Sequence, residues 1–166
     1  MTTRLDIEAT EVDVPAVDAV TIEARCRVAD IGTTVPTLFS RLGEFVGRTA
    51  LRVSGAPRII YTEMDEGDTT LVAAMPVAAG ASSHDGNADI RVRVLPAGRM
   101  WRFVHHGPYP NMGTTYDAIT EWLRQKQLIT DERDWIDFMP MWEEYVNDPA
   151  TTKPEDLLTH IYLPRP

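Results

Sequence analysis

Two adjacent glutamates lie among aromatic residues in the run Met141-Trp-Glu-Glu-Tyr-Val-Asn-Asp-Pro149. In a β-strand, Glu143 and Tyr145 would share one face, and Trp142 would point with the second glutamate, Glu144, to the other. One glutamate must therefore face the more buried side, where a carboxylate is unfavourable unless it is paired, protonated or neutralised by a ligand. An organic cation would neutralise it and would also gain from aromatic ring faces. Pairing with an arginine is the competing interpretation.

Aromatic and methionine side chains that could wall such a site become more frequent after Met100. Core packing explains many of them, and Phe103 and Trp122 are expected to serve only that purpose. Tyr109 and Tyr162 carry polar tips near the expected ends of strands or helices, where pocket walls are common. The ligand-binding residues that we predict are Glu143, Tyr145, Tyr109, Trp142, Tyr61, Trp101, Met75, Tyr162 and Phe138.

Other site chemistries lack their sequence patterns. His105 and His106 are adjacent, so in a strand their rings point to opposite faces and do not converge on one metal ion. The chain has no Cys-x-x-Cys or His-Glu-x-x-His motif, no Gly-x-Ser-x-Gly elbow and no Gly-x-Gly-x-x-Gly loop. Cys26 lies in an alternating apolar run, where a buried, inert thiol is expected. We therefore expect no metal, no cofactor and no nucleophilic triad.

The composition is that of a single globular domain. The chain has 166 residues, of which 43% are hydrophobic and 25% charged, and this excludes a disordered chain. There are 16 Lys and Arg residues against 25 Asp and Glu residues, which gives a net charge of −9. An acidic surface repels nucleic-acid backbones and anionic membranes, so we expect neither as a partner. The lack of a signal peptide or an apolar run of membrane-spanning length predicts a cytoplasmic location.

The first half of the chain predicts the order strand, helix, strand, strand. Apolar and polar residues alternate in Val20–Val28, which is typical of a half-buried strand. A helix with Pro36 in its first turn and its end near Gly47 follows. Its apolar residues recur at helical spacing, at Leu38, Phe39, Leu42, Phe45 and Val46. Arg58–Met64 and Thr69–Met75 are predicted strands joined by a hairpin loop. Residues 1 to about 18 show no clear period.

The second half predicts the same order again. Asp89–Leu95 and Met100–His106 alternate as strands, and a second helix capped by Asn111 follows. The apolar stripe of that helix is Met112, Tyr116, Ile119, Trp122 and Leu123. The remaining segments are a polar connection over residues 128–135 and strands over Phe138–Tyr145 and Leu157–Leu163.

This order predicts an α+β fold of two pseudo-symmetric strand-helix-strand-strand repeats within one domain, residues 1–166. The repeats cover about residues 18–78 and 89–164, and small, polar residues predict a linker over about 79–88. Two such units, paired through antiparallel sheets, would bury both helices and leave a central ligand groove between the halves.

Residues 96–164 resemble the GyrI-like small-molecule-binding domain, which is also the effector-binding domain of AraC-type and MerR-type bacterial transcription regulators. The resemblance rests on an ordered set of short motifs. These are Leu95-Pro-Ala-Gly98, His106-Gly-Pro-Tyr109, Tyr116 with Trp122-Leu123, Glu143-Glu-Tyr-Val-Asn-Asp-Pro149, Lys153-Pro-Glu-Asp156 and Thr159-His-Ile-Tyr-Leu-Pro164. The first half fits more loosely, through its element order and Tyr61, so the likeness spans about residues 18–164.

The resemblance implies a central groove that takes varied, often cationic and aromatic, small molecules. It places the family glutamate two residues before the tyrosine of the Asn-Asp-Pro turn, which here is Glu143. Glu144 departs from the more apolar residue of many relatives, so which carboxylate points inward stays open. The family usually places this domain behind a helix-turn-helix DNA reader. With the first predicted strand near Val20, we expect the stand-alone form.

Three functions follow from these expectations. The first is a binding protein that captures hydrophobic, aromatic and preferably cationic compounds. The second is a hydrolase of reactive cyclopropane-containing or similar electrophilic compounds, with Glu143 as general acid or base and Tyr145 or Tyr109 orienting the substrate. The third is a protein partner that modulates DNA gyrase. The expected partner is thus a small hydrophobic or cationic molecule, with a protein partner as an alternative, and the oligomeric state stays open.

Overall fold

The computed structural model describes residues 7–81, 86–87 and 89–165. Over this part of the chain it shows an α+β fold, in which one antiparallel sheet of eight strands is covered by two α-helices. The predicted linker falls partly on residues 82–85 and 88, which lie outside the described residues. Among the helices of the described segments, none is long and apolar enough to cross a membrane.

The first half contains strands β1 (Thr10–Val14) and β2 (Val17–Arg27), helix α1 (Ile31–Gly47), and strands β3 (Arg58–Met64) and β4 (Asp68–Val77). The second half contains β5 (Ile90–Leu95), β6 (Gly98–His106), α2 (Met112–Gln125), β7 (Met141–Tyr145) and β8 (Leu158–Pro164). Short 3-10 helices connect them: η1 (Val28–Asp30), η3 (Tyr109–Asn111), η4 (Glu132–Phe138) and η5 (Pro154–Asp156). The predicted order of strand, helix, strand and strand is confirmed in both halves.

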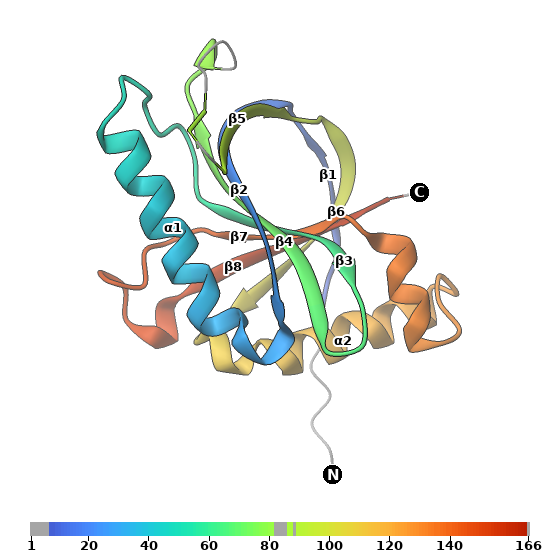
Figure 1. The fold of residues 1–166 in the computed structure, drawn as a ribbon. Helices are drawn as coiled ribbons and strands as arrows, with labels where there is room; N and C mark the ends of the chain where they lie inside the picture. The colour runs from blue at the N-terminus through green and yellow to red at the C-terminus, as the bar shows by residue number, and fades with distance from the viewer. Residues whose placement is uncertain (1–6, 82–85, 88, 166) are drawn as a thin grey trace.

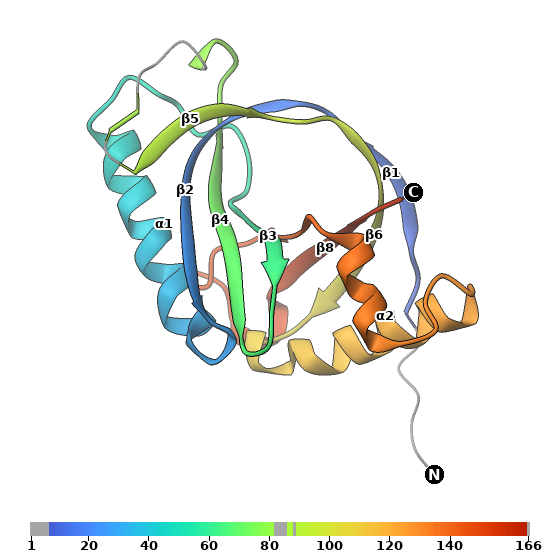
Figure 2. The same ribbon diagram turned by 45° about the vertical axis from the view of Figure 1, so that its right-hand side comes forward.

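The strands lie in the order β1-β6-β8-β7-β3-β4-β2-β5. The two repeats therefore meet where β3 pairs with β7, at the centre of the sheet. The outer strands are exchanged between the halves, since β1 pairs with β6 and β5 pairs with β2. Figures 1 and 2 show the result, in which these strands arch over and both helices lie outside the arch.

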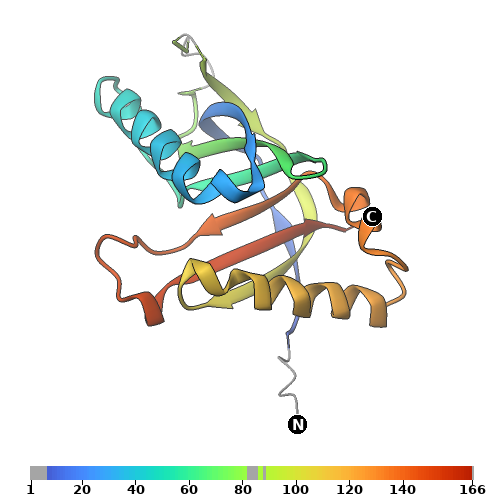
Figure 3. The same cartoon turned by 60° about the horizontal axis from the view of Figure 1, so that its bottom comes forward.

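The core lies between the outer face of the sheet and the two helices. Helix α1 contributes Leu38, Leu42 and Phe45 from the predicted stripe, and α2 contributes Ile119 and Leu123. These side chains join one main cluster with residues of the sheet, such as Ile59, Leu71, Phe103 and Ile161. Figure 3 shows α1 against the first half and α2 along the strands of the second half, so the two helices flank the central strand pair.

Besides strand β1, which was not predicted, three details differ from the sequence prediction. Helix α1 begins at Ile31, so Pro36 lies inside it and not in its first turn; the missing N–H leaves only the carbonyl of exposed Gly32 without its usual donor. The connection over 128–135 contains the start of η4, which Asp131 caps through the Arg133 N–H. The strand predicted from Phe138 begins only at Met141, because Phe138 ends η4 and Pro140 has no N–H to donate.

Candidate functional site

Glu143 lies in the middle of the sheet on the side that faces the helices. It belongs to β7 and pairs in register with Ile59 of β3 and Ile161 of β8, both fully buried. Only 5% of Glu143 is exposed to solvent. The alternation of β7 directs Glu144 to the opposite face. Of the two adjacent glutamates, Glu143 is therefore the one on the side of the helices, a point that the sequence left open.

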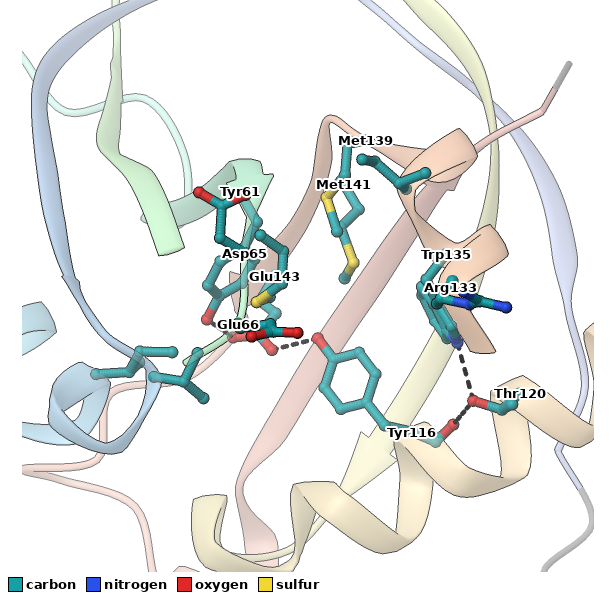
Figure 4. Close-up of a pocket in the computed structure, with 14 residues that line it drawn as sticks. Tyr61, Asp65, Glu66, Tyr116, Thr120, Arg133, Trp135, Met139, Met141 and Glu143 are labelled. Atoms are coloured by element: carbon teal, nitrogen blue, oxygen red, sulfur yellow. Dashed lines mark hydrogen bonds between the residues drawn. The ribbon is translucent and has the colours of Figure 1, made fainter. Parts of the chain in front are cut away.

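Three tyrosine hydroxyls donate hydrogen bonds to the Glu143 carboxylate. Tyr61 Oη lies 3.2 Å and Tyr145 Oη 2.8 Å from Oε1, and Tyr116 Oη donates to Oε2. These side chains come from three elements, since Tyr61 is in β3, Tyr145 is in β7 and Tyr116 is in α2. Figure 4 shows Tyr61 and Tyr116 converging on the carboxylate from opposite sides. We call these three residues the tyrosine cage.

Burial raises the pKa of Glu143, because the charged form is poorly solvated there. The hydrogen bonds from the tyrosine cage and the field of His105 act in the opposite direction and lower that pKa in part. Burial, and then the nearby negative charge of Glu143, raise the pKa values of Tyr61, Tyr116 and Tyr145. The phenols therefore stay protonated and serve as neutral donors at physiological pH.

His105 is held beside this group by two contacts. Its Nε2 lies 3.0 Å from the carbonyl oxygen of Pro108, and its Nδ1 lies 2.6 Å from Oγ1 of Thr115. Because a carbonyl oxygen only accepts, Nε2 carries a proton and donates it there. The imidazole is thus fixed in orientation between β6 and the start of α2.

A cavity of about 760 Å³ opens beside the carboxylate of Glu143, within the range of roughly 300–1,000 Å³ that small-molecule sites occupy. Its apolar and aromatic lining residues are Val28, Ile31, Tyr61, Met64, Tyr116, Trp135, Ile136, Met139 and Met141. The remaining lining residues are Asp65, Glu66, Thr120, Arg133 and Glu143. Val28, Met64 and Ile136 are large apolar residues exposed to solvent, so the cavity opens to water beside them.

The electrostatic character of the cavity is acidic. Three carboxylates line it, those of Asp65, Glu66 and Glu143, against one guanidinium, that of Arg133. Two of these charges are already paired, Asp65 with Arg25 at 2.7 Å and Arg133 with Asp131 at 3.2 Å, so the acidic character of the cavity rests on Glu66 and Glu143. Across the described parts of the chain, no group of three His, Cys, Asp or Glu side chains is placed to hold a metal ion.

Four of the predicted site residues come together here. Glu143 and Tyr61 line the cavity directly. Tyr145 binds Glu143, and the ring of Tyr109 packs edge-on against Tyr145 with centroids 5.6 Å apart.

Three others lie in the core behind the cavity. Trp101 packs against the rings of Trp122 and Phe138 at centroid distances of 5.3 and 6.5 Å. Phe138 in turn contacts the cavity residue Trp135 at 6.3 Å. Met75 packs, partly buried, against the main core cluster. None of these three is among the described lining residues.

Trp142 and Tyr162 lie on the face of the sheet opposite Glu143. Their rings stack with centroids 5.1 Å apart, and Tyr162 donates a hydrogen bond to Glu144 at 3.3 Å. The strand alternation that takes Glu143 toward the helices takes these residues away from them. The structure therefore separates them from the cavity.

Several residues that line the cavity were not predicted from the sequence. Tyr116 belongs to the predicted apolar stripe of the second helix and to the family motifs, but not to the predicted binding residues. Trp135 falls in the predicted polar connection and Met139 in the predicted strand Phe138–Tyr145. A tryptophan in an otherwise polar connection was the available signal, because so large an apolar ring is seldom left in solvent.

The sequence model of the GyrI-like small molecule binding domain matches residues 8–165. Among curated proteins, none matches this chain. Among solved structures, the C-terminal domain of EcmrR has a TM-score of 0.75 at 15% identity and covers 96% of this chain and 98% of its own. EcmrR in a complex with DNA gives the same TM-score at 16% identity, but this chain spans only 57% of that chain.

Two further structures extend the comparison. SAV2435, solved bound to tetraphenylphosphonium, has a TM-score of 0.66 at 15% identity and covers 95% of this chain and 93% of its own. A hydrolase from Listeria innocua has a TM-score of 0.54 at 12% identity and covers 95% and 91%. At these identities the structures share the fold. Because the family's sequence model matches almost the whole chain, the protein belongs to the GyrI-like small-molecule-binding domain family.

Proposed function

We propose that this protein captures hydrophobic, aromatic and preferably cationic small molecules in the cavity beside Glu143. One observation carries the proposal: a carboxylate 5% exposed faces an apolar cavity, and its hydrogen-bond donors are three neutral phenols. An ionised carboxylate in such a place is incompletely compensated, because its partners supply dipoles and no formal charge. A bound cation supplies that charge.

The walls of the cavity suit the rest of such a ligand. Tyr61, Tyr116 and Trp135 offer aromatic rings, and Met139 and Met141 offer adaptable apolar surface. A cation over an aromatic face gains about 0.5–2 kcal/mol, so several such contacts are needed for micromolar affinity. The ligand in the SAV2435 structure, tetraphenylphosphonium, is a hydrophobic aromatic cation. It is therefore a suitable probe for this chain.

The test compares tetraphenylphosphonium with the neutral triphenylphosphine oxide by titration calorimetry. For Glu143→Gln we expect the affinity for the cation to fall at least tenfold, about 1.4 kcal/mol, while that for the neutral compound changes less than threefold. The matched control is Glu144→Gln, since that carboxylate lies on the other face of the sheet and should leave both affinities within twofold. An equal loss for both compounds in Glu143→Gln would contradict the proposal.

Hydrolysis of an electrophilic ligand is the second candidate function. The observation that favours it is the same buried carboxylate, whose raised pKa suits a general acid or base. Glu143 would move the proton of an attacking water, and Tyr145, which donates to Oε1, would help to orient the substrate. Incubation with a cyclopropane-containing alkylating compound, followed by mass spectrometry, tests this candidate: recovery of unchanged compound removes it. The gyrase-partner alternative stays a prediction.

A further inference from the structure

A second polar cluster lies on the inner face of the sheet, the face that carries neither α-helix (Figures 1 and 2). It is built from four neighbouring strands. Register places Arg58 of β3 beside Glu144 of β7, and Glu144 beside His160 of β8. Two residues further along these strands, on the same face, Trp142 lies beside Tyr162, and Tyr162 lies beside Arg102 of β6. We call these residues the inner-face cluster: Arg58, Arg102, Trp142, Glu144, His160 and Tyr162.

Several nitrogen atoms of this cluster are shielded from solvent yet have no hydrogen-bond partner. They are Nε of Arg58, Nε of Arg102, Nε1 of Trp142 and Nδ1 of His160, and only one further side-chain atom of this kind occurs among the described residues. Arg58 as a whole is only 8% exposed. A buried N–H group without an acceptor is unfavourable and rare in folded proteins. The Nε–H groups of Arg58 and Arg102 and the indole N–H of Trp142 are donors in every protonation state, and an additional acceptor on this face would satisfy them.

The one carboxylate of the cluster does not fill that role. Glu144 Oε2 lies 3.9 Å from Nε of Arg58, which is beyond hydrogen-bond distance, and Oε1 lies 3.4 Å from Nδ1 of His160, which is at the limit of that distance. Glu144 instead accepts from the hydroxyl of Tyr162 at 3.3 Å. Nε1 of Trp142 and Nε of Arg102 have no acceptor, although the guanidinium of Arg102 also interacts with the hydroxyl of Tyr162.

The charge of the cluster is also unbalanced. Two guanidinium groups face one carboxylate, in a chain whose net charge is −9. Burial and the positive charge of Arg102 lower the pKa of His160, against the pull of Glu144, so the imidazole adds little charge at neutral pH. Toward the edge of the same face, Arg91 and Arg93 of β5 are paired in register with Thr21 and Ala19 and are exposed. Glu23 of β2 is exposed on the same face as well, so the excess of positive charge belongs to the cluster itself, with its two guanidinium groups and one carboxylate.

The ring of Trp142 is held in place by its neighbours. The Arg58 guanidinium carbon lies 5.3 Å from the ring centroid, and the ring of Tyr162 stacks at 5.1 Å. The donors are therefore fixed before any ligand arrives, which reduces the entropy lost on binding. His160 and Glu144 keep about a fifth of their side-chain surface exposed, so a solute can reach the cluster from water.

We propose that the inner-face cluster is a second ligand site, which binds a small oxyanion, a carboxylate or a phosphoryl group, through the N–H groups of Arg58, Arg102 and Trp142. Oxyanions accept several hydrogen bonds at once and pair with guanidinium groups more strongly than neutral acceptors do. This site lies across the sheet from Glu143 and does not depend on the cation proposal.

The test uses the full chain labelled with ¹⁵N. The indole signal of Trp142, assigned from its loss in Trp142→Phe, and the Nε–H signals of Arg58 and Arg102 are followed during separate additions of sodium benzoate and inorganic phosphate. Sodium chloride at matched ionic strength is the control. We expect saturable shifts of these signals, with the indole signals of Trp101 and Trp122 unmoved. Saturation by benzoate alone assigns a carboxylate ligand, and saturation by phosphate alone assigns a phosphoryl group.

A pair of variants localises the effect. Arg102→Gln should weaken the anion at least fivefold, and Arg93→Gln, on the same face but outside the cluster, should change the affinity less than twofold. The wild-type titration stands even if a variant fails to fold. No saturable shift, or the same shift with chloride, would overturn the proposal and leave ordered water as the acceptor. Equal weakening by both variants would also overturn it, because that is the behaviour of general surface charge.

Discussion

Glu143 is a carboxylate whose hydrogen-bond donors are all neutral, so its protonation state depends on a balance. Burial raises its pKa, and the tyrosine cage lowers it in part. The donors come from both halves of the chain, since Tyr61 lies in the first and Tyr116 in the second. Single changes at these residues therefore report directly on the charge that the cavity presents to a ligand.

Removal of one phenol should shift that balance toward the neutral acid. In Tyr116→Phe, loss of a donor to the charged form raises the pKa of Glu143 further, so a smaller fraction of the carboxylate is ionised at a given pH. We expect the affinity for tetraphenylphosphonium to fall by roughly tenfold, about 1.4 kcal/mol, with a smaller loss at pH 9. Calorimetry at both pH values measures this. Tyr162→Phe, on the other face, is the control; the same loss at both pH values would contradict the explanation.

The raised pKa of Glu143 also predicts how stability changes with pH. A carboxyl group whose folded-state pKa lies above its unfolded value stabilises the fold fully at pH values below the unfolded value of about 4.5, and that contribution is lost as pH rises through the folded value. A glutamine at position 143 does not titrate, so in Glu143→Gln this loss of stability with rising pH no longer occurs. Its melting temperature relative to wild type should therefore rise by a few degrees between pH 4 and pH 8, as measured by differential scanning calorimetry. A constant difference across this range would contradict the assignment.

At the scale of elements, η4 and α2 form one wall of the cavity. Trp135 of η4 packs against the ring of Tyr116 with centroids 6.1 Å apart, and its Nε1 donates to Thr120 Oγ1 at 3.1 Å. Thr120 in turn donates to the carbonyl of Tyr116 at 2.9 Å. Figure 4 shows this chain of contacts, which fixes η4 onto the helix beneath it.

A change in this wall should affect cationic and neutral ligands alike, whereas a change at Glu143 should affect mainly the cationic ligand. Trp135→Leu removes ring surface and one hydrogen bond, so we expect it to weaken tetraphenylphosphonium and triphenylphosphine oxide by a similar factor, about fivefold to tenfold. The ratio of the two affinities is the internal control, because it should stay near the wild-type value. A selective loss of the cation would show that the tryptophan acts through charge and would contradict its role as a wall.

The sequence predicted those elements whose own residues carry the pattern. Alternation in β2 and the apolar stripe of α1 reflect burial of one face, which is a local property. Strand β1 was missed because its five residues include only two apolar ones, Val12 and Val14, which is too short a pattern to stand out, and its partner β6 lies far along the chain. Helix η4 was missed because a helix of seven residues has too few turns to show a period.

The difference between a local pattern and the packing of distant elements also explains which site residues could be predicted from the sequence. Glu143 and Tyr145 were predicted together because one strand face fixes their relation. Tyr116 and Trp135 reach the carboxylate and its cavity only through the way α2 and η4 pack on the sheet, and no spacing in the sequence encodes that packing. Trp142 and Tyr162 matched a wall by residue type, yet strand alternation directs them to the other face.

At the scale of the whole molecule, the two halves depend on each other. Strand β3 would lose β7, β2 would lose β5, and Glu143 would lose the donor from Tyr61 if the chain were divided. We therefore expect a fragment of residues 1–81 to show no cooperative thermal transition by circular dichroism, while the full chain shows one. A fragment that melts cooperatively near the temperature of the full chain would contradict this dependence.

We propose that ligands bind at the junction of the halves, between the tyrosine cage and η4. The most direct measurement is the position of bound tetraphenylphosphonium from nuclear Overhauser contacts. The phenyl protons should contact ring protons of Tyr61, Tyr116 and Trp135 and the methyl groups of Met139. Contacts with Trp142 or Tyr162 in their place, or none at a saturating concentration, would contradict the account.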